Sequence, residues 1–314
     1  MVATSCDDPV NPSGGTTQPL PTPTPPGDTT KNPIDKNDLD YTVQYGTDSK
    51  QELTISWPSF YEKISTPLYV AFFLGSNGDL DDEYSEENLQ YIIDELLTQG
   101  NANFAAVKIS YRYGTAEYML KDIYDAVKFV KDNATLLKVD TSKAGMMGYS
   151  LGGYLATLYS YKETSPIPIK LTVCQSGFAD LTEESFYTFE DDLEETMLDE
   201  RLELVSDLIG EDITPSEFKN GFLSNPSAKR VKLEELSLKY YYRNNSPEVH
   251  FYHGINDNIV NINNIKTFAT GKTTKVTVIE FNSGHNDLSS DGGVMQTATD
   301  KLSEVVRREF ISKS

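Results

Sequence analysis

The sequence is poor in positive charge and in long hydrophobic runs. It carries 27 Lys and Arg against 48 Asp and Glu in 314 residues, which gives a formal charge of −21. We expect no nucleic-acid partner, because binding phosphates requires clustered cations, and the same charge disfavours adsorption to anionic membranes. The sequence contains no run of roughly 18 consecutive apolar residues, which is the length that a membrane-spanning helix needs. With 38% hydrophobic residues in 314, the chain can still form the hydrophobic core of one large domain or two small ones.

Cysteine is also scarce, and the two residues present stand in unlike surroundings. Cys6 lies in a Pro- and Thr-rich segment, residues 1–36, which holds 8 of the 15 prolines and almost no large apolar side chain. Such a segment cannot bury enough surface to offset its chain entropy, so we expect a disordered tether. Cys174 stands in an apolar run and is expected to be a buried small hydrophobe, so no disulfide is predicted.

Small residues precede Cys6, and the polar tether follows it. This arrangement resembles the processed end of a bacterial lipoprotein, whose first mature cysteine carries the lipid. The resemblance implies an exported protein that faces away from the cytoplasm and meets a membrane only through a lipid anchor on Cys6. An ordinary disordered N-terminus with an incidental cysteine is the alternative.

The rest of the chain, residues 37–314, alternates strand-like and helix-like segments. This alternation predicts an α/β domain with a mostly parallel sheet, helices on both faces and an antiparallel edge made by the first two strands. Residues 178–245 interrupt it with two or three helical stretches, which we interpret as a cap over the carboxyl edge of the sheet, where active sites lie. Strands are expected at 41–45, 53–57, 68–74, 105–111, 144–147, 169–174, 249–252 and 276–281, and helices near 85–100, 120–130, 151–161 and 295–310.

One short motif points to nucleophilic catalysis. Residues 148–152 read Gly-Tyr-Ser-Leu-Gly, follow a predicted strand and open a predicted helix. A nucleophile elbow has this pattern, because so tight a turn needs small residues on both sides of the serine whose hydroxyl it projects. Ser150 is therefore the candidate nucleophile, and Tyr149 beside it is a candidate substrate contact. A glycine-rich turn with a solvent-facing serine is the alternative.

A serine nucleophile needs a base, and the chain has only three histidines. His250 alternates within a predicted strand and is expected to pack there. His253, at the end of that strand, is expected to stabilise the following turn. His285 lies in a loop just past the last predicted strand, where it could reach the elbow, so we predict that it is the base.

The base needs a carboxylate that orients it and stabilises its protonated form. Asp257 follows the preceding strand, and the order Ser150, Asp257, His285 is the order of α/β-hydrolases. Asp287 is the rival, but two residues from His285 is poor geometry for supporting the same ring.

An oxyanion hole completes such a site, with one amide from the residue after the nucleophile and another from the loop after an early strand. Leu151 supplies the first amide. The loop after residues 68–74 supplies the second, with Ser76 preferred and Gly75 next.

From about Tyr41 to the C-terminus, the sequence resembles α/β-hydrolase esterases of the branch that contains hormone-sensitive-lipase-like carboxylesterases and bacterial feruloyl and acetyl xylan esterases. The resemblance implies hydrolysis of carboxylic esters through an acyl-enzyme on Ser150. The oxyanion loop departs from the pattern, with Leu-Gly-Ser where relatives often have His-Gly-Gly. The matching segments are 110–113, 122–127, 139–140, 148–153 and 253–260.

The expected function is that of a serine carboxylesterase, acting on acetyl or feruloyl esters of plant polysaccharide. A generic short-chain esterase or lipase, a prolyl-oligopeptidase-like peptidase and a catalytically silent binding protein are the alternatives. No cofactor or metal is expected, because the acidic run 79–83 lacks the glycine and downstream glutamate of a calcium loop. Residues 180–212 contain fourteen acidic side chains and a single basic one, Arg201. Because this acidic segment lies in the predicted cap, we expect neutral esters to be preferred over anionic ones.

Overall fold

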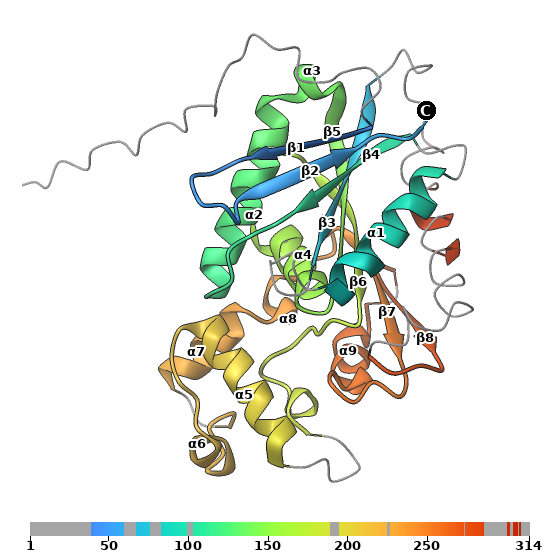
Figure 1. Cartoon of the computed structure of the whole chain (residues 1–314). Coiled ribbons are helices and arrows are strands. Elements are labelled where there is room, and N and C mark those ends of the chain that lie inside the picture. Colours follow the sequence, from blue (N-terminus) through green and yellow to red (C-terminus); the bar gives the residue numbers. More distant parts are fainter. Residues whose placement is uncertain are drawn as a thin grey trace, which may run out of the picture.

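The protein is described here from a computed structural model, which covers residues 39–59, 67–75, 83–98, 103–188, 195–224, 227–272, 274–285, 300–301, 304–306 and 308. Its centre is an eight-stranded sheet with the order β1-β2-β4-β3-β5-β6-β7-β8 (Figure 1). β2 runs antiparallel to β1 and β4, and all other neighbours are parallel, so the predicted mixed, mostly parallel sheet is confirmed. The strands are β1 (Asp40–Gln44), β2 (Glu52–Ser56), β3 (Leu68–Leu74), β4 (Phe104–Ile109), β5 (Val139–Tyr149), β6 (Ile169–Gln175), β7 (Glu248–Gly254) and β8 (Val276–Phe281).

The sheet is covered on both faces, and β3 shows why its sequence is apolar throughout. Val70, Phe72 and Leu74 point into one core, which α2 (Ala116–Asp132), α4 (Leu151–Lys162) and α9 (Ile262–Ala269) cover. Ala71 and Phe73 point to the opposite face, where α1 (Glu83–Thr98) packs. In a strand that is covered on both faces, side chains on either side are buried, so apolar and polar residues do not alternate along it. Figure 1 shows α2 and α1 on opposite sides of the strands.

The segment between β6 and β7 contains more helices than the sequence predicted. The sequence predicted two or three helical stretches here, and the described part of the segment contains four α-helices. They are α5 (Glu195–Ile209), α6 (Pro215–Lys219), α7 (Ala228–Glu235) and α8 (Leu238–Tyr241). α5, α6 and α7 gather below the sheet in Figure 1. α8 instead lies against α4. The fold is thus an α/β-hydrolase sheet with a helical insertion, whose last helix returns to the core.

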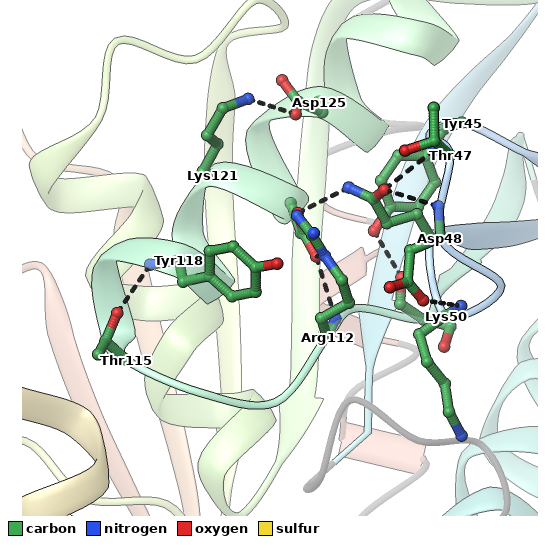
Figure 2. A network of polar contacts seen from close by, with 12 residues as sticks. Tyr45, Thr47, Asp48, Lys50, Arg112, Thr115, Tyr118, Lys121 and Asp125 are labelled. Atoms are coloured by element: carbon green, nitrogen blue, oxygen red, sulfur yellow. Dashed lines mark hydrogen bonds and ion pairs between the residues drawn. The ribbon is translucent and has the colours of Figure 1, made fainter. Parts of the chain in front are cut away.

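A buried ion pair ties the loop after β4 to α2. Asp122 is fully buried and accepts hydrogen bonds from Arg112 Nε at 2.9 Å, Arg112 Nη2 at 2.6 Å and Gln51 Nε2 at 2.8 Å. The hydrogen bonds to Asp122 raise the pKa of Arg112. Figure 2 shows the Arg112 guanidinium beside the ring of Tyr118, with 4.0 Å between Cζ and the ring centroid. This network positions the segment that carries Tyr111.

We expect Asp122→Ala to lower the free energy of unfolding by about 3 kcal/mol, because it leaves a partly buried guanidinium and a buried amide without their acceptor. Asp125→Ala is the matched control on the same helix. Asp125 makes an exposed pair with Lys121, worth about 0.5 kcal/mol. Urea unfolding followed by circular dichroism measures both variants. Equal losses would contradict the assigned role of Asp122.

Candidate active site

The turn between β5 and α4 holds Ser150 in a strained conformation. Ser150 has φ 50° and ψ −120°, which few non-glycine residues adopt, and such strain concentrates at functional sites. The turn is also tight, since a Cβ atom on Gly148 would lie 2.4 Å from the backbone carbon of Gly152. These are the geometric properties of a nucleophile elbow, and they explain why glycine stands at both positions.

His285 links Ser150 to Asp257, so the structure brings together the three residues singled out in the sequence. His285 Nε2 lies 3.1 Å from Ser150 Oγ, and His285 Nδ1 lies 2.7 Å from Asp257 Oδ2. The other carboxylate oxygen, Oδ1, accepts the backbone N–H groups of Ile259 at 2.9 Å and Val260 at 2.8 Å. Because Nδ1 faces a carboxylate, it carries the proton, which leaves Nε2 free to accept the serine proton.

Asp257 is a buried anion. Burial by itself raises the pKa of a carboxyl group, but hydrogen bonds from His253 and His285 outweigh that effect and hold the pKa of Asp257 well below its usual range. The carboxylate is therefore charged at every pH at which a histidine base operates. It faces His285 as a fixed negative charge that favours the protonated imidazole.

Two further side chains hold the loop that carries His285. Ser176 donates its hydroxyl to the backbone oxygen of His285 at 3.1 Å, and Tyr149 donates to the same oxygen at 3.3 Å. The rings of Tyr149 and His285 lie 5.5 Å apart between centroids. The structure thus places Tyr149 against the base, and its contact with substrate stays a prediction. Ser176 was not singled out in the sequence, and its positive φ of 51° leaves no sequence signal.

The loop after β3 lies directly against the first turn of α4. A Cβ atom on Gly152 would be 2.3 Å from the backbone oxygen of Gly75 and 2.4 Å from that of Leu74. Tyr111 donates its hydroxyl to the same Gly75 oxygen at 2.6 Å. Leu151, the first residue of α4, has a backbone N–H without an intrahelical acceptor. The loop and this amide therefore lie close enough to form one anion-binding site.

Gly152→Ala should lower kcat at least tenfold, because the new methyl group pushes the Gly75 loop away from the helix, and an oxyanion donor is worth about 3 kcal/mol. Gly114→Ala is the control, since a Cβ atom there makes only an ordinary 3.5 Å contact with Tyr118. Steady-state kinetics on one ester measures both. A Gly152→Ala enzyme with unchanged kcat would show that the close approach is dispensable.

The insertion contributes a side chain that the sequence did not mark as part of the site. Arg201, on α5, is buried and donates to the backbone oxygens of Ile259 at 3.1 Å and Asn258 at 3.0 Å. It thereby braces the loop that begins at Asp257. Burial lowers the pKa of Arg201, and the charge of Asp257 partly counteracts this. Its only sequence signal was its isolation among acidic residues.

Two further residues singled out in the sequence, Cys174 and His250, lie in the core. Cys174 is buried, and burial raises the pKa of its thiol to about 12, which confirms it as a core residue. His250 is buried in β7 with Nε2 2.7 Å from Glu248, which confirms its packing role. Cys6, Ser76 and Asp287 lie outside the described residues, as does the tether 1–36.

A cavity of about 930 Å³ opens in the insertion, lined by Leu198, Phe218 and Val231 among others, and Ser150 is not part of its lining. Among the described residues, no group of three or more His, Cys, Asp or Glu side chains is arranged to hold a metal ion. The described helices also include none long and apolar enough to cross a membrane.

The fold recurs in solved bacterial esterases. A truncated carbohydrate esterase from gut microbiota is 19% identical with a TM-score of 0.59, over 88% of this chain and 99% of that one. An esterase of Thermogutta terrifontis with butyrate bound is 18% identical with a TM-score of 0.59, over 88% and 96%. A bifunctional GH43-CE protein of Bacteroides eggerthii is 17% identical with a TM-score of 0.58, over 86% of this chain and 38% of that one. At such identities the likeness establishes the α/β-hydrolase fold.

The sequence itself also identifies the family. No curated protein matches the chain. A family model described as BD-FAE matches residues 61–271, which is more than half of the chain and includes the elbow and Asp257. The expected fold and enzyme class are confirmed, and the chain belongs to the BD-FAE family of acetyl xylan and feruloyl esterases, as a serine carboxylic ester hydrolase.

Proposed function

We propose that Ser150, His285 and Asp257 are the catalytic triad of this esterase. The single observation that carries the proposal is the unbroken hydrogen-bonded series from Ser150 Oγ through both ring nitrogens of His285 to Asp257 Oδ2, at 3.1 Å and 2.7 Å. The strained Ser150 backbone supports it, because the elbow aims the hydroxyl out of the sheet edge.

The proposed reaction has two acyl-transfer steps. Ser150 Oγ attacks the ester carbonyl carbon while its proton passes to His285 Nε2, and the resulting oxyanion is bound by the amide of Leu151 and one from the Gly75–Ser76 loop. Collapse of the intermediate breaks the bond to the alcohol, which takes the proton from His285. Water then attacks the acyl-enzyme and gives a proton to His285. His285 passes a proton to Ser150 Oγ as the bond to the acyl group breaks, and the acid is released.

For the substrate, we propose acetyl or feruloyl groups on plant polysaccharide. The BD-FAE family match supports this class, and a carbohydrate esterase shares the fold. The test compares release of acetate and ferulate from acylated xylo-oligosaccharides with release from the ethyl esters of the same acids, whose leaving alcohol is similarly unactivated. Higher kcat/KM on the sugar esters supports the proposal.

The other functions are outcomes of the same assay. Equal or better kcat/KM on the ethyl esters identifies a generic short-chain esterase or lipase. Turnover of matched peptide amides alone identifies a peptidase of the prolyl-oligopeptidase type. A wild-type enzyme as inert as Ser150→Ala on every ester and amide would point to a silent binding protein.

The exposed acidic face of α5 supports a preference for neutral esters. Asp199, Glu200, Glu203 and Asp207 are exposed on this helix, which also supplies Arg201 to the active-site loop. We expect an acetate ester to be hydrolysed several-fold faster than the hemisuccinate of the same phenol. The ratio should shrink as the Debye length falls from ~8 Å at physiological salt to ~3 Å at 1 M. A ratio that salt leaves unchanged would argue against this effect.

We also propose that the protein is exported and anchored through a lipid on Cys6. The small residues before this cysteine and the Pro- and Thr-rich residues after it support the proposal. Labelling of the precursor with a fatty acid in a bacterial host should mark the wild type and not Cys6→Ala. Equal labelling of the two, or none, would refute the anchor.

A further inference from the structure

A second histidine contacts the carboxylate of Asp257. His253, the penultimate residue of β7, is completely buried, and its Nε2 lies 3.1 Å from Asp257 Oδ2. The same oxygen accepts His285 Nδ1 at 2.7 Å. The two imidazoles therefore approach one oxygen of the triad acid, while the other oxygen is occupied by the N–H groups of Ile259 and Val260.

The tautomer of His253 follows from its surroundings. Nε2 faces two acceptors, the Asp257 carboxylate and the backbone oxygen of Val260 at 2.9 Å, so it must carry a proton. Nδ1 is buried and has no hydrogen-bond partner among the described residues. A proton on Nδ1 would place a second, unsatisfied N–H in the core, which is costly. His253 is thus a neutral donor fixed in one tautomer.

We propose that His253 is a positioning residue of the triad, which shares Asp257 with the base His285 and limits how strongly the carboxylate attracts the proton on that base. The inference rests on the proposed catalytic role of His285. It goes beyond the bracing of the turn, which the bond to Val260 alone would provide.

The charged groups around the carboxylate determine the direction of the effect. His285 faces Asp257 from the loop after β8, His253 faces it from β7, and Arg201 interacts with its charge from α5, where the exposed Glu200 interacts in turn with Arg201. Loss of the His253 donor leaves more negative charge on Oδ2, so the Asp257–His285 pair binds a proton more readily. The active form needs an unprotonated base, and the acid limb of the pH profile should therefore move to higher pH.

The test uses two side chains of similar length at position 253. His253→Gln keeps an amide N–H in place of Nε2–H, whereas His253→Met fills similar space without a donor. We expect the acid limb of kcat/KM to move up by about half to one pH unit in His253→Met, as one hydrogen bond predicts. His253→Gln should stay near the wild type. His250→Gln, in the same strand, is the control and should leave the profile unchanged.

A merely structural role would lower stability in both variants and leave the pH profile in place, and that result would overturn the proposal. NMR of ¹⁵N-histidine-labelled wild type gives a second check, with the His250→Gln variant used to identify the signals of His250. The spectra should show His253 as the neutral Nε2–H form throughout the active pH range, and a cationic His253 would overturn the proposal. Ser150→Ala separates the two proposals, because its full activity would refute the triad itself.

Discussion

Turnover of every ester should fall by about 10⁶ in Ser150→Ala, the largest effect expected of any single change in this protein. The substitution removes the atom that forms the acyl-enzyme and leaves His285 and Asp257 without a proton to move. The residual rate would come from substrate binding and the oxyanion donors alone. Single-turnover measurement of acetate release, which detects slow rates, would quantify the loss.

The matched control is Ser160→Ala, on α4, the helix that begins directly after Ser150. Ser160 Oγ donates to the backbone oxygen of Thr157 and takes no part in the site. We expect kcat within a factor of two of the wild type, since a half-buried hydroxyl at this position contributes at most about 1 kcal/mol to stability. A Ser150→Ala enzyme that loses less than a hundredfold would mean that another nucleophile acts.

The sheet could be predicted where strands are apolar and bounded by turns, and less well where they are not. β3 was predicted as a buried strand because its residues are all apolar, and every one except Tyr69 is buried. β5 was predicted only at 144–147, whereas the strand starts at Val139. Residues 140–143 are polar and only partly buried or exposed, so neither periodicity nor hydrophobicity marks them as strand.

The triad could be predicted because each member has a sequence signal that its position reinforces. Glycines flank Ser150, and the loop positions of Asp257 and His285 follow successive strands. The supporting residues have no such signal. Arg201 and Tyr111 donate to backbone oxygens, which any residue type provides, so no pair of side chains reveals them. His253 was predicted to stabilise the turn after β7, and its hydrogen bond to the backbone oxygen of Val260 is consistent with that role. Its contact with Asp257 depends on the backbone conformation of the loop, which the sequence does not reveal.

Asp257→Asn should lower kcat by about 10⁴, by analogy with other serine hydrolases. The neutral amide removes the charge that favours protonated His285. Its amide group would also have to accept from two imidazole N–H groups on one side and two backbone N–H groups on the other. An amide nitrogen cannot accept, so one side is left with donor facing donor, and His285 loses the partner that selects its tautomer.

The control for Asp257→Asn is Asp287→Asn. Asp287 stands two residues after His285 in the chain and was the rival candidate for the triad acid. We expect this variant to retain wild-type kcat, because His285 Nδ1 is already bound by Asp257 at 2.7 Å and has no second acceptor position to fill. The reverse result, with activity lost in Asp287→Asn and kept in Asp257→Asn, would reassign the acid. It would also remove the basis for any role of His253, since that role requires the charge to reside on Asp257.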